Sequence, residues 1–399
     1  MAVTGLAMGH PPMGEDRPGG LAVAPSAATA PRTGTVSRLR RAPRVAVIGA
    51  GVVGCTVAWR IRQALEFDVD IYERRHDILM ETSAGTSNRL HHGYQYALSA
   101  QTATTLREYH PQFEEVYGQC IVPSTNYYGV ADRSAISPAQ YLDFCARCDL
   151  PVEPKRPAGV FTDHVLLALL SLEKSLDPGS LRELCRQRLQ DCGVRVIFAT
   201  ATPSMLDSYD YVISAVYGNP NLLQDPSRQQ HYYFSLCEMM IVELPGRYAG
   251  LSAMIVYGPF MTFDVLGTTG NHVLYHGIHG VHHVNVGRFA DLPAVYQPFL
   301  YRFTPARDLD GLTRAALALH DAGRYFGGLD QARHIASNFV VRVQAPGDVR
   351  TAVRRTTIQK IRPGWFSISA SKLSACVSIG DTMIGLLQRG EGSDRRAAS

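Results

Sequence analysis

Two stretches of the chain combine residue types and spacings that chemistry could use. The first, "VAVIGAGVVGC", places Gly49, Gly51 and Gly54 in the spacing G-x-G-x-x-G. The second, "SAGTSNRLHHGYQY" at residues 83–96, begins with small polar side chains and then presents His91 beside His92. Closely spaced glycines let a backbone approach a phosphate, and a histidine exchanges protons near neutral pH. We therefore expect a phosphate-bearing ligand at the first stretch and a reacting group near the second.

The elements around the glycines must form a strand, a tight turn and a helix. The run Val45 to Ile48 is continuously apolar, as a strand buried on both faces should be. Val57, Ile61 and Leu65 then recur at helical spacing. A phosphate at this turn would meet the positive end of the helix. The turn residues expected to contact it are Gly49, Ala50, Gly51, Val53 and Gly54.

A second strand, "FDVDIYERR", ends in an acidic residue at the distance that a dinucleotide requires. Glu73 lies 19 residues after Gly54 and is followed by Arg74. A carboxylate there can accept both hydroxyls of an adenosine ribose and would repel a 2′-phosphate. This pattern fits NAD and FAD equally. The polar loop that follows Glu73, in place of a further strand–helix unit, favours FAD, and an NAD-dependent dehydrogenase is the alternative.

The arrangement resembles the D-amino-acid-oxidase-like superfamily of FAD-dependent oxidoreductases. That superfamily includes glycine and sarcosine oxidases, glycerol-3-phosphate dehydrogenase and L-2-hydroxyglutarate oxidase. In the last two, a His-Gly-Gly or His-Ala-Gly element followed by a tyrosine lies at the flavin, and "LHHGYQY" is similar to it. His91 matches the histidine, Gly93 the glycine and Tyr96 the tyrosine, whereas His92 stands where a small residue is usual.

Three later stretches resemble the same superfamily. "SLDPGSLRELCRQRLQDCGVRVIF" is similar to the segment that returns to the FAD domain, and "YDYVISAVYGNPNLL" to a strand and turn near the flavin, with Ala215 in the turn. "GWFSISASKLSACVSIGDTMIGLL" resembles the closing loop and helix, in which Lys372 and Leu373 match the usual Gly-Gly-Lys-Leu-Thr. Ala370 and Ser371 replace its glycines. That difference keeps open a second alternative, a catalytically weak scaffold or partner protein.

The resemblance implies an α/β fold, in which a Rossmann-type FAD-binding domain carries an antiparallel-sheet substrate domain (α+β). Residues rich in β-branched and aromatic side chains between 226 and 342 read as the strands of the second domain. The expected FAD-binding parts are 43–125, 175–225 and 343–390, the substrate-domain parts are 126–174 and 226–342, and the expected disordered termini are 1–42 and 391–399.

The implied chemistry is hydride transfer from a small amine, amino acid or hydroxy acid to the flavin N5 of noncovalent FAD. Thr86, Ser87 and Asn88 are expected near the ribityl chain. His91 is the expected base for a hydroxyl proton, while an amine can react in its neutral form. The electron acceptor, oxygen or another oxidant, stays open.

A substrate carboxylate would call for an arginine, because the guanidinium fork matches two carboxylate oxygens. Arg89, Arg342 and Arg362 are the possibilities, and the sequence does not choose among them. Arg89, close to the cofactor loop, could instead bind phosphate or a backbone carbonyl.

Two further patterns test for a metal, and neither predicts one. In "HGIHGVHH", His276 and His282 would share one face of an extended strand and His279 the other, and no carboxylate lies within six residues of the cluster. Cys145 and Cys148 form a lone C-x-x-C without the second pair of a zinc site, so we expect thiols along a helix.

Composition excludes several partners. The net charge of +4 over 399 residues, with no basic stripe, argues against nucleic acid. No apolar run is long enough to cross a bilayer. The eight cysteines have no disulfide spacing, which favours the cytoplasm. The pair Arg40–Arg41 precedes the first predicted strand directly, so cleavage of an export signal there would destroy the domain.

Overall fold

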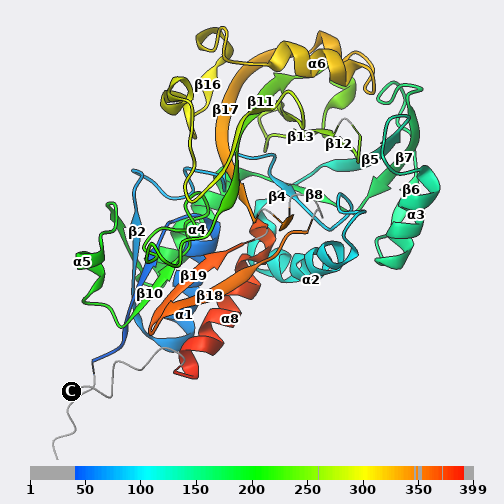
Figure 1. Ribbon diagram of the computed structural model, residues 1–399. Helices are drawn as coiled ribbons and strands as arrows, with labels where there is room; N and C mark the ends of the chain where they lie inside the picture. The colour runs from blue at the N-terminus through cyan, green and yellow to red at the C-terminus, as the bar shows by residue number, and fades with distance from the viewer. Residues whose placement is uncertain (1–40, 259, 346, 349–352, 371, 391–399) are drawn as a thin grey trace, which may run out of the picture. The chain divides into compact units, whose positions relative to one another are not determined.

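The computed structural model describes residues 41–390 apart from 259, 346, 349–352 and 371. The terminal segments 1–40 and 391–399, expected to be disordered, and Ser371 of the closing loop lie outside the described residues. From residue 42 onward the described chain forms one compact unit that contains both of its large sheets (Figure 1).

The first sheet is built from strands that come from both ends of the described chain. Its order is β18-β19-β10-β1-β2-β9. Neighbouring strands run parallel except for β18 and β19, which form an antiparallel edge. Their bounds are β1 (Arg44–Ile48), β2 (Asp68–Glu73), β9 (Arg195–Phe198), β10 (Tyr211–Ser214), β18 (Thr357–Arg362) and β19 (Trp365–Ser369).

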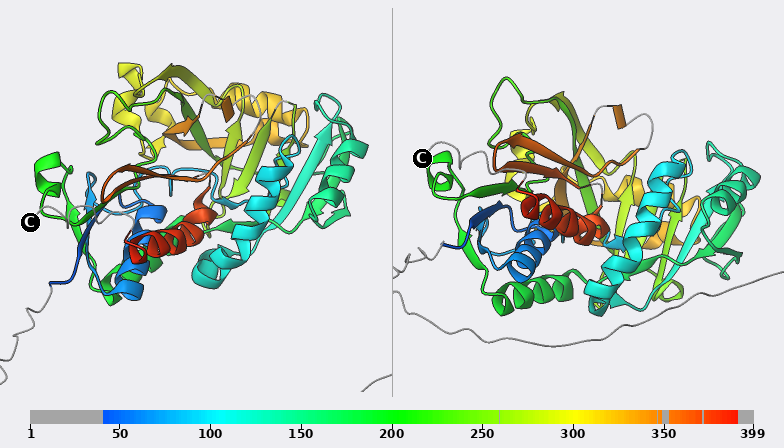
Figure 2. Two further views of the ribbon diagram at one scale, coloured as in Figure 1. Left: turned by 60° about the horizontal axis from the view of Figure 1, so that its bottom comes forward. Right: turned by 90° about the horizontal axis from the view of Figure 1, so that it is seen from below.

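Helices cover this sheet because its central strands are apolar on both faces. Val45 and Val47 of β1 pack with α1 (Val52–Leu65), α2 (Ala100–Tyr117), α4 (Pro178–Asp191) and α8 (Cys376–Gln388). Figures 1 and 2 show α1 and α8 side by side. Ala46 and Ile48 point to the opposite face, where the short α5 (Pro203–Leu206) packs. The strand–turn–helix–strand predicted over residues 45–73 is confirmed.

The second sheet has ten strands, and β12 with β5 is its one parallel pair among the described residues. This pair departs from the antiparallel sheet that the sequence predicts. The main path is β16-β17-β11-β14-β13-β12-β5-β7-β6, with β15 paired to β11. The bounds are β5 (Thr125–Ala131), β6 (Val152–Pro154), β7 (Val165–Ser171), β11 (Tyr232–Glu243), β12 (Leu251–Ile255), β13 (Met261–Val265), β14 (His272–His276), β15 (Val281–Gly287), β16 (Thr304–Pro305) and β17 (Arg333–Gln344).

Smaller elements complete the unit. β3 (Arg89–Leu90), β8 (Lys174–Leu176) and β4 (Ile121–Val122) form a three-stranded sheet. α6 (Ala315–Gly323) covers the ten-stranded sheet with an apolar face. α3 (Pro138–Arg147) carries Cys145, and Cys148 is its C-cap residue, as the sequence predicts for thiols along a helix. Both thiols are free and buried.

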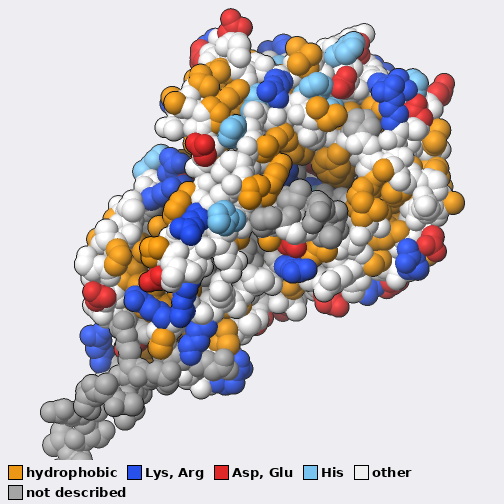
Figure 3. Space-filling model, in the orientation of Figure 1, with side chains coloured by type: hydrophobic (Ala, Val, Ile, Leu, Met, Phe, Trp, Pro, Cys, Tyr) orange, Lys and Arg blue, Asp and Glu red, His pale blue; other side chains and the backbone are white. Residues whose placement is uncertain are grey.

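The charge distribution on the surface and the character of the helices agree with what the composition predicts. On the face shown in Figure 3, Lys and Arg side chains are scattered among acidic and apolar ones. Within the described part of the chain, no helix combines the length and the apolar character that crossing a membrane requires.

Candidate active site

The turn between β1 and α1 can be formed only by glycine at two positions. Gly49 has a φ of +96°, in the region that side chains disfavour. A Cβ atom on Gly54 would lie 1.9 Å from the carbonyl oxygen of Gly49, so the helix starts in direct contact with the strand end. The carbonyl oxygen of Ala215 lies 3.0 Å from the Cβ position of Gly49. Gly49, Gly54 and Ala215 therefore shape the turn through close packing.

Glu73 lies at this turn, as the sequence predicts. It is the last residue of β2, and its Oε2 accepts a hydrogen bond from the amide of Ala50 at 2.8 Å. Its Oε1 accepts one from the amide of Arg75, also at 2.8 Å. The side chain of Arg74 bonds to Glu81 at 2.6–2.8 Å and is largely exposed. The carboxylate is thus fixed beside the turn, while Arg74 is occupied by another partner.

The N-terminus of α1 offers free amide groups. Gly51 is its N-cap residue, and the amide of Val52 donates to Ser83 Oγ at 3.1 Å. No described residue accepts a hydrogen bond from the amides of Val53 and Gly54. Unpaired amides and the helix dipole together attract an anion.

A cavity of about 850 Å³ opens beside this helix end, within the size range of small-molecule sites. Three kinds of segment line it: the polar loop 82–89, strands of the ten-stranded sheet, and the closing segment that leads into α8. The predicted residues that it brings together are Val53, Thr86, Ser87, Asn88, His91, Lys372 and Leu373. The remaining predicted cofactor residues are not part of this lining.

Two buried polar atoms at the cavity have no protein partner. Asn88 is only 3% exposed, and its Nδ2 finds no acceptor among the described residues. Ser374 lies in the turn before α8, and its Oγ is likewise buried and unpaired. Buried polar groups without a protein partner indicate a bound molecule or water. Ala370 also lines the cavity and does not have a positive φ, so its backbone conformation does not require glycine.

Two of the three arginines considered for a carboxylate are already engaged. Arg89 is fully buried, with its Nε 2.6 Å from Asp264 Oδ1 and its Nη1 3.3 Å from Glu173 Oε2. Arg362 stacks 3.5 Å from the ring centroid of Trp365 and lies outside the cavity lining. Arg89 is therefore a cation held by two carboxylates at the cavity wall, and Arg362 lies outside the cavity.

Of the three arginines considered, Arg342 is the one that remains available to a ligand. It projects from β17 into the cavity, 5.0 Å from the ring centroid of Tyr275, and no described carboxylate forms an ion pair with it. Lys372 lies in the same cavity, 5.5 Å from the ring of Tyr96. Burial, followed by repulsion from Arg342 and Arg354, lowers the pKa of Lys372 well below its usual value. The cavity therefore favours an anionic ligand.

His91 lies on the cavity wall in a form suited to accept a proton. Its Nδ1 is buried without a hydrogen-bond partner among the described residues, and it lies 3.6 Å from Glu173 Oε1. Burial and then the charge of Lys372 lower the pKa of His91 to about 4, although Glu173 opposes the shift. The ring is therefore neutral near pH 7. Its neighbour His92 stacks on His110 at 3.9 Å, which accommodates the bulky ring where the resemblance leads one to expect a small residue.

No pattern in the sequence indicated Glu173, whose carboxylate lies next to His91. Glu173 lies between β7 and β8, far from His91 along the chain. The pairing of β3 with β8 brings the two together, since Leu90 lies opposite Lys174. Pairing between distant short strands leaves no local pattern in the sequence.

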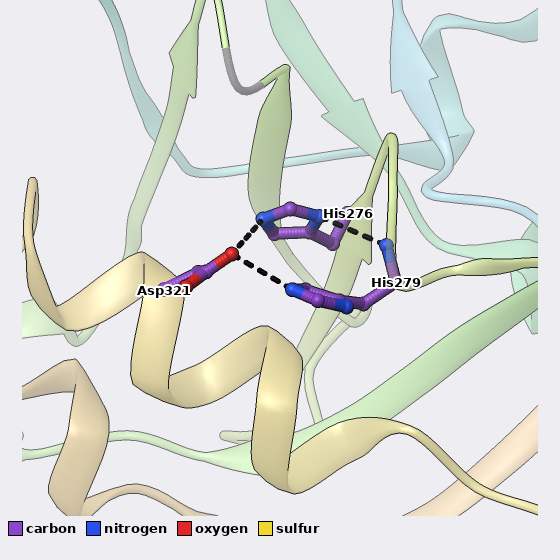
Figure 4. Close-up of side chains that lie close together, drawn as sticks. All are labelled: His276, His279 and Asp321. Atoms are coloured by element: carbon purple, nitrogen blue, oxygen red, sulfur yellow. Dashed lines mark hydrogen bonds and ion pairs between the residues drawn. The ribbon is translucent and has the colours of Figure 1, made fainter.

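The histidine cluster differs from what the sequence predicts. His276 ends β14 and β15 begins only at Val281, so the four histidines do not lie on one strand. The intervening turn folds His279 back until its ring lies 4.7 Å from that of His276 (Figure 4). Asp321 of α6 supplies the carboxylate that is missing locally, with its Oδ2 2.7 Å from His279 Nε2 and 3.9 Å from His276 Nε2. The assignment of His279 to the opposite face was wrong.

The hydrogen bonds to His276 indicate which of its ring nitrogens carries the proton. His276 Nδ1 accepts from the amides of Ile278 and His279, each at 3.2 Å. A neutral ring then carries its proton on Nε2, the atom directed at Asp321. Metal-bound histidines usually show the opposite arrangement, with the second nitrogen donating. His276, His279 and Asp321 could hold an ion by distance alone. These amides disfavour one, and the expectation of no metal stays a prediction.

Comparison with known proteins gives one sequence-family match and several similar folds. Residues 44–212 match the sequence family described as FAD dependent oxidoreductase. No curated protein matches the chain in sequence. Among solved structures, glycine oxidase from Geobacillus kaustophilus has a TM-score of 0.63 at 13% identity, covering 87% of this chain and 95% of that one. The L-proline dehydrogenase from P. horikoshii gives 0.63 at 12%, covering 88% and 94%. The glycerophosphate oxidase from Mycoplasma pneumoniae, with FAD bound, gives 0.62 at 14%, covering 87% and 95%.

The residues of this chain fit FAD. The tight turn and the free amides of α1 suit a pyrophosphate, Glu73 suits a ribose, and the unpaired Asn88 and Ser374 line the adjoining cavity. These features come from segments far apart in the sequence. FAD is the cofactor in the description of the matching family and is bound in the glycerophosphate oxidase. Residues 44–212 thus match the family described as FAD dependent oxidoreductase, and the described chain shares its fold with glycine oxidase and the glycerophosphate oxidase.

Proposed function

We propose that the enzyme oxidises a small 2-amino acid, with Arg342 binding the substrate carboxylate. The single observation that carries this proposal is an arginine that lines the cavity without a carboxylate partner among the described residues. An arginine held in this way is expected to have an anionic ligand, because an unpaired buried charge is unfavourable. The neighbours named glycine oxidase and L-proline dehydrogenase support an amino-acid substrate.

The two sheets have separate roles in this proposal. The six-stranded sheet with α1, α4 and α8 is the Rossmann-type FAD-binding domain, and the ten-stranded sheet forms the substrate domain. The ranges 126–174 and 226–342 support this assignment, because they contain most residues of the ten-stranded sheet. The substrate would lie between Arg342 of β17 and the polar loop with His91.

FAD, when bound, supplies the acceptor for a hydride from the substrate carbon. The residues of the chain have three tasks around it. The glycine turn, Glu73 and the loop with Asn88 would hold the cofactor. Arg342 would orient the substrate, and His91 Nε2 would take a proton from the substrate amino group. The cavity wall would exclude water.

The test compares amino acids with the amines that lack only the carboxylate. Bleaching of the flavin absorbance is followed without oxygen, with matched pairs such as alanine and ethylamine. We expect bleaching by amino acids alone, and Arg342→Met to raise KM by about 100-fold, the equivalent of about 2.7 kcal/mol. Arg362→Met is the control, because that side chain stacks on Trp365 outside the cavity. Equal bleaching by both members of a pair would refute the role of Arg342.

A 2-hydroxy acid is the second candidate, and His91 favours it. A hydroxyl group must lose its proton to a base during oxidation, and His91 is a neutral imidazole on the cavity wall. Lactate and alanine have the same carbon skeleton and carboxylate. Faster bleaching by the hydroxy acid of such a pair would select this candidate.

The cofactor link is proposed to be noncovalent. Acid precipitation of the yellow protein should leave the flavin absorbance in the supernatant. Colour that stays in the pellet would show a covalent bond instead.

A further inference from the structure

Glu173 is a buried carboxylate whose oxygens face different partners. Its side chain has no solvent exposure. Oε2 accepts hydrogen bonds from Tyr128 Oη at 2.6 Å and from Arg89 Nη1 at 3.3 Å. Oε1 accepts one from the amide of His92 at 2.9 Å and lies 3.6 Å from His91 Nδ1. Donors thus fix the carboxylate on both sides, with Oε1 turned toward His91.

The groups around Glu173 keep its carboxylate ionised. Arg89 is the cation of the group and contacts both Glu173 and Asp264. Burial raises the pKa of Glu173, but His91, Arg89 and Tyr128 outweigh it and lower the pKa to about 2. Burial raises the pKa of Asp264, while Arg89 opposes this shift. Glu173 is therefore ionised, and a proton gained by His91 would place opposite charges 3.6 Å apart.

We propose that Glu173 is the positioning residue for His91. It holds the ring with the proton on Nδ1, so that the lone pair of Nε2 faces the cavity and can accept the proton of the substrate. The positive ring that forms then lies beside the Glu173 carboxylate. This inference rests on the proposed function, because it assigns His91 as the base of that reaction.

The proton transfer balances within these groups. The bond from the substrate nitrogen or oxygen to its proton breaks, and a new bond forms between that proton and His91 Nε2. The two electrons of the substrate C–H bond leave as hydride to FAD, the oxidant of the proposed reaction. His91 keeps its Nδ1 proton throughout, and the distance of 3.6 Å to Glu173 is expected to shorten when the ring becomes charged.

Glu173→Gln is the informative substitution, because the neighbours decide how the amide lies. Tyr128 and the charged Arg89 both donate at Oε2, whereas the His92 amide alone donates at Oε1, so the carbonyl oxygen of the glutamine takes the Oε2 position. Its NH₂ group then points at His91 Nδ1, which must act as acceptor. The His91 proton therefore moves to Nε2 and blocks the lone pair. A loss of kcat of about 100-fold is expected, with little change in KM.

Kinetics of a double-mutant cycle separate positioning from general stabilisation. His91→Ala should lower kcat by about 100-fold or more, and adding Glu173→Gln to it should change kcat less than about twofold. Multiplying effects would overturn the proposal. Glu238→Gln is the matched control, since Glu238 is another fully buried carboxylate, 2.7 Å from His282 and outside the cavity lining. It should lower stability and leave kcat unchanged.

A spectroscopic measurement makes the outcome independent of turnover. ¹⁵N NMR of the histidine rings in the full-length holoenzyme reports which nitrogen carries the proton, with the His91→Ala spectrum assigning the signal. The proton should lie on Nδ1 in the wild type and on Nε2 in Glu173→Gln. An unchanged proton position would overturn the proposal.

If Glu173→Gln fails to fold, Tyr128→Phe loosens the same carboxylate and should lower kcat by a smaller factor. If no amino or hydroxy acid is oxidised, the proposed function fails while the spectra still decide the role of Glu173.

Discussion

Gly54→Ala is predicted to disrupt the start of α1. The added Cβ would lie 1.9 Å from the carbonyl oxygen of Gly49, whereas a carbon and an oxygen normally stay about 3.3 Å apart. The obstacle is backbone at the end of a buried strand and cannot rotate away. The helix must therefore move by more than about 1 Å, away from a core that is already packed.

The energetic consequence follows from the size of the folded unit. Overpacking of this kind lowers the free energy of unfolding by about 3 kcal/mol. An unfolding entropy of about 2.1 cal/mol/K per residue over residues 42–390 means that each kcal/mol lowers the melting temperature by roughly 1.4 °C. The apoprotein should thus melt about 4 °C lower.

Gly51→Ala is the matched comparison at the same turn. The new Cβ would meet only Ser83 Oγ, at 3.1 Å, and Gly51 already has an extended φ of −70° that alanine adopts. The apoprotein should melt within about 1 °C of wild type, because the cap penalty and the gain in chain entropy nearly cancel. The methyl group lies at the helix end where the pyrophosphate would bind, so FAD affinity should fall by about 10–100-fold.

Two measurements are needed. Calorimetry of the apoproteins gives the melting temperatures, and isothermal titration with FAD gives the affinities. Our reasoning about the turn would be refuted if Gly54→Ala left the apoprotein melting temperature unchanged. It would equally be refuted if Gly51→Ala bound FAD as tightly as the wild type.

Two further predictions concern the buried histidines and the His276–His279–Asp321 cluster. Burial, as the largest cause, lowers the pKa of His91, His110 and His276 to about 4, and the unfolded chain binds their protons near pH 6.5. Between these values the unfolded state holds more protons, so the free energy of unfolding should fall as the pH drops from about 6.5 to 4, by at most about 3 kcal/mol for each histidine. Urea unfolding at several pH values measures the slope, and His276→Gln should flatten it; an equal slope would contradict the assignment. Zinc ions should change the melting temperature of wild type no more than that of Asp321→Asn, and a larger rise in wild type would reveal a metal site.

The nucleotide turn was readable from the sequence because its strand, turn and helix are local. They follow one another within 22 residues, and the contact that excludes a side chain at Gly54 comes from Gly49 in the same turn. Glu73 at the end of β2 follows from the same short unit. Helix and strand periodicities are likewise local, so most element positions could be predicted.

The cavity chemistry could not be read in this way. The sequence offered three arginines on equal terms, and only the fold separates Arg89, paired with two carboxylates, from Arg342, which faces the cavity unpaired. The histidine cluster shows the same limit, because the partner of His279 is 42 residues away on α6.

The sequence by itself therefore determined the strand–turn–helix–strand unit that ends at Glu73, and it singled out His91. The tertiary structure alone decided which charges neutralise one another and which remain for a ligand. The physical reason is that the pKa and availability of a buried charged group depend on the partners within a few ångströms. For His91, Glu173 and Arg342, strand pairings between distant parts of the chain bring those partners into place.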